Sequence, residues 1–150
     1  MRRNIEIGGR DIELEANLGT AAFYQELTGY NLFEISSRIA KMMTDAVKTV
    51  TTNNPKASKS ELKVDLIGSG IGEASSLAVE TAEALAYIMN LQTQFGKTKE
   101  DIYKIREKLT KDDQLEWMMS FSPESFTYKT YTEIMSFWKA QSKETSIEKN

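Results

Sequence analysis

Apolar and polar residues alternate at the start of the chain, on both sides of a glycine pair. The apolar positions are Ile5, Ile7, Ile12 and Leu14, and the pair is Gly8-Gly9. This spacing predicts a β-hairpin in which residues 4–7 pair with residues 11–15. Because an isolated hairpin is barely stable in water, its isoleucine face must pack on another element. The helix that follows is the obvious candidate.

Two helical patterns come next. Asn17 is expected to cap a helix that ends at Thr28, with Gly29 as a left-handed C-cap. Asn31 is expected to cap a second helix, residues 32–50, whose apolar positions recur at helical spacing. These positions are Leu32, Ile35, Ile39, Met42, Ala46 and Val50, with Met43 and Val47 beside them. This is the most regular amphipathic pattern in the chain.

A break in periodicity follows, and residues 51–72 are expected to form a flexible connector. The stretch 51–60 is polar, contains Pro55 and shows no period. Residues 61–67 suit a short helix or a short strand, and the pattern does not choose between them. Gly68, Gly70 and Gly72 then interrupt regular structure.

The next segment predicts a long helix from Glu73 to about Phe95. Its apolar residues cover more than one face, which is typical of a helix at the centre of a bundle or at an oligomer interface. Thr98 and Thr110, each followed by acidic residues, predict the starts of two short helices.

The last predicted helix spans residues 122–139. Its start signal is Ser122-Pro123-Glu124, which combines an N-cap, a proline at the first helical position and an early acid. Beyond Lys139 the sequence is polar and is expected to fray.

These patterns predict a mainly α fold, a helical domain with a small N-terminal β-hairpin. One domain of residues 1–150 is expected, made of a hairpin (1–15), two helices (17–50), a flexible connector (51–72), a helical remainder (73–141) and a polar tail (142–150).

The amino-acid composition excludes several classes of catalytic and metal-binding site. The 150 residues include 19 basic and 22 acidic side chains, with no histidine and no cysteine. Disulfides, thiolate or imidazole metal sites and histidine-dependent triads are therefore excluded. The net charge of −3 disfavours a nucleic-acid binder. No apolar run suits a signal peptide or a membrane span, so a cytoplasmic protein without membrane contact is expected.

Two features suggest chemistry, and each has a simpler interpretation. The glycines at 68, 70 and 72 precede a helix, as phosphate-binding loops do, but the spacing matches no nucleotide-binding fingerprint and a hinge is favoured. The pairs Glu100-Asp101 and Asp112-Asp113 lie in first helical turns, where acids stabilise the helix dipole. We assign no catalytic, cofactor-binding or metal-binding residue.

Half of the aromatic side chains lie within residues 117–138. They are expected on more than one side of the last helix, with Tyr131, Ile134 and Trp138 together on one of them. Two interpretations stay open, a purely structural core or a core combined with a docking surface, where Trp and Tyr are over-represented.

Three segments, taken together, resemble the tail assembly chaperones of long-tailed bacteriophages (siphoviruses) and related prophages of Gram-positive bacteria. They are the glycine hairpin of residues 5–14 leading through 17–28 into 29–33, the alanine-rich helix of residues 80–91, and the helix of residues 122–139 with its Phe137-Trp138 pair. The resemblance is one of order and length along most of the chain.

The resemblance implies a non-enzymatic role. Such chaperones bind the long, helical tape measure protein in the host bacterial cytoplasm before the tail tube polymerises around it, and the finished virion lacks them. A longer frameshifted form commonly contacts the tail tube protein, and this chain corresponds to the short form. The chain is expected to form homo-oligomers and to bind no nucleic acid, membrane or cofactor.

For such a chaperone, apolar helix faces are the expected binding surfaces, as in helix-in-groove recognition. The candidate partner-binding residues are Leu32, Ile35, Ile39, Met42, Met43, Tyr131, Ile134 and Trp138. The main alternative is a small nucleic-acid-associated phage or bacterial regulator that uses Arg2, Arg3 and the lysines near Lys104. A third is an enzyme that binds a phosphate ligand at residues 68–72.

Overall fold

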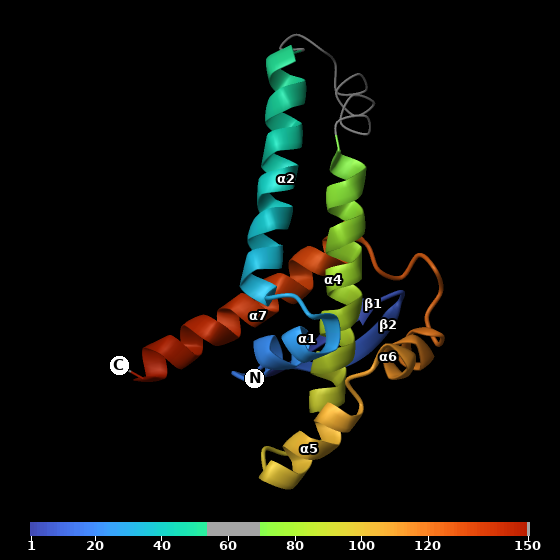
Figure 1. Cartoon of the computed structure of the whole chain (residues 1–150), viewed down its shortest axis with the longest axis vertical. Coiled ribbons are helices and arrows are strands. Elements are labelled where there is room, and N and C mark those ends of the chain that lie inside the picture. The colour runs from blue at the N-terminus through green and yellow to red at the C-terminus, as the bar shows by residue number, and fades with distance from the viewer. Residues whose placement is uncertain (54–69, 150) are drawn as a thin grey trace.

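The computed structural model describes residues 1–53 and 70–149. They form a mainly helical fold with an N-terminal antiparallel hairpin, as predicted. The elements are β1 (Arg2–Ile7), β2 (Arg10–Glu15), α1 (Thr20–Thr28), α2 (Leu32–Asn53), α4 (Ile71–Gln92), α5 (Lys99–Glu107), α6 (Lys111–Met118) and α7 (Tyr128–Lys149) (Figure 1).

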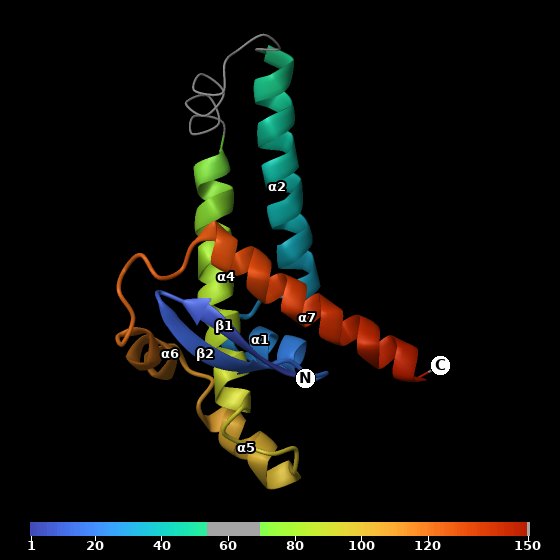
Figure 2. The same ribbon diagram turned by 180° about the vertical axis from the view of Figure 1, so that it is seen from behind.

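Helix α4 is the centre of the molecule. It contacts β2, α1, α2, α6 and α7, and the two opposite views show these elements arranged around it (Figures 1 and 2). The six consecutive residues from Ala84 to Met89 are all buried, so the helix is covered on every side there. The apolar residues on several faces of this helix predicted either the centre of a bundle or an oligomer interface, and the structure shows the first.

The predicted hairpin is present, with strands that extend beyond the predicted residues 4–7 and 11–15. Ile5 pairs with Ile12, Gly8 and Gly9 form the turn with φ values of 61° and 79°, and the apolar face is buried. The expectation that the following helix supports this face was wrong. The hairpin packs mainly on α4 and α7, whereas α1 packs on α4 and α2. Long-range packing decides this choice, and adjacency in sequence does not reveal it.

The first two helices differ from their predicted bounds mainly at one end. Helix α1 begins at Thr20, because the Asn17 side chain accepts a hydrogen bond from the Gly19 backbone N–H (2.8 Å) and forms a turn before the helix. Gly29 ends the helix with φ at 81°, as predicted. Asn31 caps α2 by accepting from the Glu34 N–H at 3.1 Å.

Helix α2 continues to Asn53, so residues 51–53 are helical and not part of a connector, and residues 54–69 of the predicted connector lie outside the described residues. Gly70 adopts a φ of 97° at the N-terminus of α4, which begins at Ile71 and includes Gly72. The choice between helix and strand for residues 61–67 falls outside the described residues, as does Gly68.

The last helix was predicted to begin too early. Residues 122–127 form turns that bury Ser125 and Phe126, and α7 starts at Tyr128. Thr127 is the effective cap, since its hydroxyl accepts from the Thr130 N–H at 3.2 Å. The helix then runs to Lys149, through the region expected to fray, because no glycine or proline interrupts it.

The short helices have the predicted caps. Thr98 and Asp101 form a reciprocal capping box at the start of α5, and the Thr110 hydroxyl accepts from the Asp113 N–H at the start of α6. In the described part of the chain, no helix has the length and apolar character needed to cross a lipid bilayer.

Two buried tyrosines make the stability of the fold depend on pH. Burial raises the pKa of Tyr87 to about 12, helped by the negative charges of Asp113 and Glu116. Burial also raises the pKa of Tyr131 to about 12. In the unfolded chain these tyrosines lose their protons near pH 10, whereas in the folded chain they keep them until about pH 12. Raising the pH from 10 to 12 therefore favours the unfolded state increasingly. Below pH 10 both tyrosines are protonated in either state, and their full contribution to the unfolding free energy is present.

We therefore expect the wild-type chain to lose stability between pH 10 and 12, with about 1–2 kcal/mol of the loss due to Tyr131. The variant Tyr131→Phe should lack that share, and Tyr103→Phe, at a ring that is 54% exposed, should behave as wild type. Urea unfolding at pH 7 and pH 11, followed by circular dichroism, measures the difference. Equal pH dependence in wild type and Tyr131→Phe would contradict the assignment.

Candidate partner-binding surface

Helices α2 and α4 form an arm that extends beyond the rest of the fold. Both views show the C-terminal half of α2 and the first turns of α4 projecting side by side (Figures 1 and 2). Ala74, Ala78 and Ala82, spaced four residues apart on α4, are fully buried, and Ala46 on α2 is 4% exposed. These small side chains allow the two helices to approach closely.

The predicted binding residues on α2 separate into two groups. Leu32, Ile35 and Ile39 are 1–5% exposed and belong to the core at the base of the arm. Met42 and Met43 are half-buried and lie further out. The stripe is therefore structural over its first two turns, and only its outer part reaches the surface.

The predicted residues on α7 are all buried. Tyr131, Ile134 and Trp138 are 6%, 0% and 3% exposed, because α7 packs on α4 and β1 and crosses the base of the arm (Figure 2). The Trp138 ring also meets the ring of Phe33, with centroids 4.9 Å apart. In this conformation six of the eight predicted residues belong to the core and are covered by the chain itself. Their role in partner binding stays a prediction, and of the eight only Met42 and Met43 are partly exposed here.

The remaining surface candidate consists of the apolar side chains on the outer arm. We define this arm surface as Met42, Met43, Val47, Ile71 and Val79. Val47 is 45% exposed and the other four are half-buried. Methionine is flexible and polarisable, so it adapts to partners of different shape.

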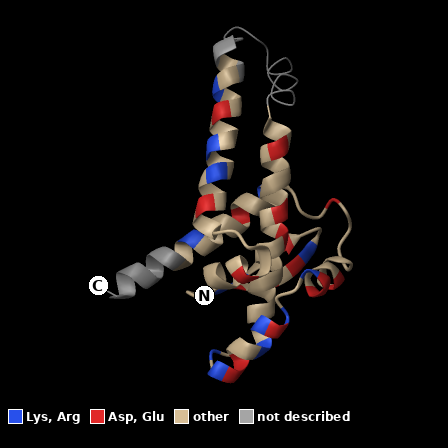
Figure 3. Cartoon of the chain, viewed as in Figure 1, with Lys and Arg blue, Asp and Glu red and all other residues tan. Residues whose placement is uncertain are grey.

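Residues with charges of both signs alternate along α2 with the residues of the arm surface (Figure 3). They are Arg38, Lys41, Asp45 and Lys48. Mixed charge keeps a partly apolar helix soluble, while the apolar side chains between the charges stay available for contact.

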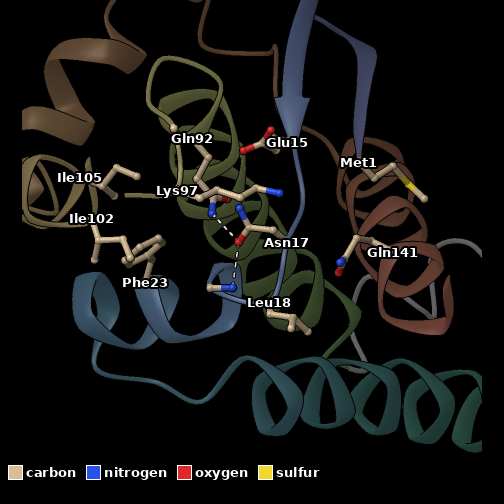
Figure 4. A pocket seen from close by; sticks show the side chains of 12 residues that line it. Met1, Glu15, Asn17, Leu18, Phe23, Gln92, Lys97, Ile102, Ile105 and Gln141 are labelled. Carbon is tan, nitrogen blue, oxygen red and sulfur yellow. Dashed lines mark hydrogen bonds between the residues drawn. The ribbon is translucent and has the colours of Figure 1, made fainter. Parts of the chain in front are cut away.

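A separate pocket of about 680 Å³ lies at the opposite end of α4 (Figure 4). Phe23, Ile102 and Ile105 gather on one side, and Met1 and Gln141 lie on the other. The walls come from α1, α5, α7 and the N-terminus, so the pocket is a product of the tertiary fold.

Three polar side chains of this pocket, those of Glu15, Asn17 and Gln92, have polar partners within the chain. Gln92 donates to the Asn17 side-chain oxygen (2.9 Å) and accepts from the Thr20 hydroxyl (2.9 Å). Glu15 pairs with Arg2 at 3.0 Å. The hydrogen bonds of Gln92 connect the end of α4 to the start of α1, so these polar groups serve the fold. Sequence reasoning missed the contacts of Gln92 because its partners, Asn17 and Thr20, are 75 and 72 residues away in the chain.

The residues proposed for other chemistry also have structural roles. Asp101 and Asp113 take part in helix caps, and the described residues contain no group of three or more acids, cysteines or histidines arranged to hold a metal ion. The Arg2 guanidinium bridges Glu13 and Glu15, and that of Arg3 lies 5.2 Å from the centre of the Phe137 ring. These engagements do not favour the nucleic-acid alternative.

Comparison with known proteins adds no functional assignment. The chain matches no family model, no curated protein sequence and no solved structure. The functional argument therefore rests on the residues of this chain and on the resemblance described above.

Proposed function

We propose that this chain is a non-enzymatic tail assembly chaperone that binds the tape measure protein and so helps to recruit tail tube subunits. The observation that carries the proposal is the two-helix arm, whose outer half bears methionine and valine side chains at the surface. The resemblance in segment order supports the same role.

The physical basis is temporary coverage of apolar surface. A long helical client exposes apolar stripes until its final assembly partner covers them. A projecting helix pair can bind such a stripe along its length, in the manner of helix-in-groove recognition. Several copies bound along one client would gain from avidity, since each further contact on the same client is effectively intramolecular.

The arm surface gives a direct test. We expect co-expression with the tape measure protein of the same genome to keep that client soluble. The double variant Met42→Glu/Val47→Glu should lower the soluble client about tenfold or more, because two charges would be desolvated in the complex. Sedimentation followed by quantitative gel analysis measures the soluble fraction.

A control variant separates this effect from general surface change. Met119→Glu alters a side chain that is 76% exposed at the C-terminal cap of α6, and it should leave client solubility unchanged. Circular dichroism must show the same helical content for both variants. If wild type leaves the client insoluble, or if the arm variant protects it equally well, the proposed function is wrong.

A further inference from the structure

A groove of about 410 Å³ lies on another face of α4, beside α6 and near α1 and the base of α2. Its lining combines apolar and polar side chains. Those that matter here are Leu77, Glu80 and Glu83 on α4, and Gln114, Leu115 and Met118 on α6. Leu115 is 60% exposed, so part of the apolar lining is open to solvent.

Gln114 carries an unsatisfied acceptor. The side chain is 92% buried, and its amide N–H contacts only the Met118 sulfur, at 3.5 Å. Its carbonyl oxygen has no hydrogen-bond partner among the described residues. A buried acceptor without a donor is unfavourable, and Gln114 is one of the residues that line the groove. The missing partner is a hydrogen-bond donor.

The surrounding charge specifies what kind of donor fits. Helix α4 contains Glu73, Glu80 and Glu83 and no basic residue, and α6 has three acids against Lys111. Glu80 and Glu83 are three residues apart and both line the groove. Burial raises the pKa of Glu83, and the charge of Glu80 adds to this effect. Neither carboxylate forms an ion pair among the described residues, and Lys111 is the one basic residue in the lining.

We propose that this groove binds a lysine side chain presented by an amphipathic helix of a partner protein. The ammonium group would donate to the Gln114 carbonyl oxygen and the two carboxylates, and the aliphatic stem would lie along Leu77 and Met118. Leu115 would contact apolar neighbours of the lysine. This site is distinct from the arm surface, and its test does not depend on the proposed function.

Lys111 is the one basic residue in the lining, and its charge opposes an incoming lysine. Replacing it therefore changes the charge of the groove in the direction opposite to replacing a carboxylate. If the site recognises charge, Lys111→Gln strengthens binding and the glutamate variants weaken it.

The experiment uses the full chain and three synthetic helical peptides. Each has 18 residues with an apolar face, and they differ only in one central position, which is lysine, norleucine or glutamate. NMR titration of the labelled chain gives the affinities and the location of binding. We expect the lysine peptide to bind about tenfold tighter than the glutamate peptide, with shifts centred on Glu83 and Gln114, and the difference to shrink at high salt.

Matched variants test the named groups. Glu80→Gln/Glu83→Gln should reduce the preference for lysine over norleucine to less than about twofold, whereas Glu100→Gln at an exposed α5 position should not change it. Gln114→Leu should also weaken that preference, and Lys111→Gln should increase it. The thermal unfolding of each variant shows that it is folded.

Three outcomes would overturn the proposal. One is equal affinity for the lysine and glutamate peptides, and another is unchanged preference in the double glutamate variant. The third is concentration-dependent self-association, measured by light scattering, that Leu115→Ala abolishes. In that case a second copy of this chain occupies the groove.

Discussion

Replacing Leu85 by alanine is expected to cost about 3–5 kcal/mol of unfolding free energy. Leu85 lies in the middle of α4, has no exposed surface and belongs to the single core cluster of the described residues. Truncation removes buried apolar contacts and leaves a cavity that α4, held by elements on several sides, cannot close by moving. A domain of this size is usually stable by only about 5–15 kcal/mol, so much of its stability would be lost.

The same substitution at an exposed leucine is the matched control. Leu115→Ala removes the same atoms from a side chain that is 60% exposed, and it should change stability by no more than about 0.5 kcal/mol. Urea unfolding followed by circular dichroism gives both values. Similar losses in the two variants would contradict the central position of α4.

Gly8→Ala is expected to cost about 2–4 kcal/mol, more than a turn substitution normally does. Gly8 has a φ of 61°, where a side chain is strained. An added Cβ would also overlap the Ser125 hydroxyl and lie 2.8 Å from the Ser125 Cβ. Ser125 is itself buried in the segment before α7, so it has little room to move. The hairpin turn and this segment therefore pack tightly against each other.

Gly9→Ala separates strain from overlap. Gly9 also has a positive φ, 79°, but nothing lies within 4 Å of its added Cβ. It should cost only about 1–2 kcal/mol, from backbone strain alone. Adding Ser125→Gly to Gly8→Ala should recover most of the difference between the two glycine variants. Equal losses for Gly8→Ala and Gly9→Ala, measured by urea unfolding, would show that the contact with Ser125 is unimportant.

Local signals predicted most of the elements because their causes are local. The hairpin follows from two-residue alternation around Gly8-Gly9, and the capped starts of α5 and α6 follow from side chains that bond within one turn. The start of the last helix was misplaced for the same reason. Ser122-Pro123 is a good local signal for a helix start, but the segment after it adopts a non-helical conformation in which Phe126 is buried.

The candidate sites were less predictable. The pattern identified Leu32, Ile35 and Ile39 as one apolar face, but an apolar face is the same in sequence whether the chain covers it or a partner does. The packing of α2 on α4 and α1 buries it. The groove beside α6 was missed because its lining residues Glu83 and Gln114 come from two different helices, and no periodicity connects them.

The sequence alone therefore determined the type and order of the secondary structure, since these depend on periodicity, turns and caps within a few residues. It also excluded histidine and cysteine chemistry by composition. The tertiary structure decided which apolar faces are core and which remain at the surface. It decided as well which distant polar groups meet, because both depend on contacts between residues far apart in the chain.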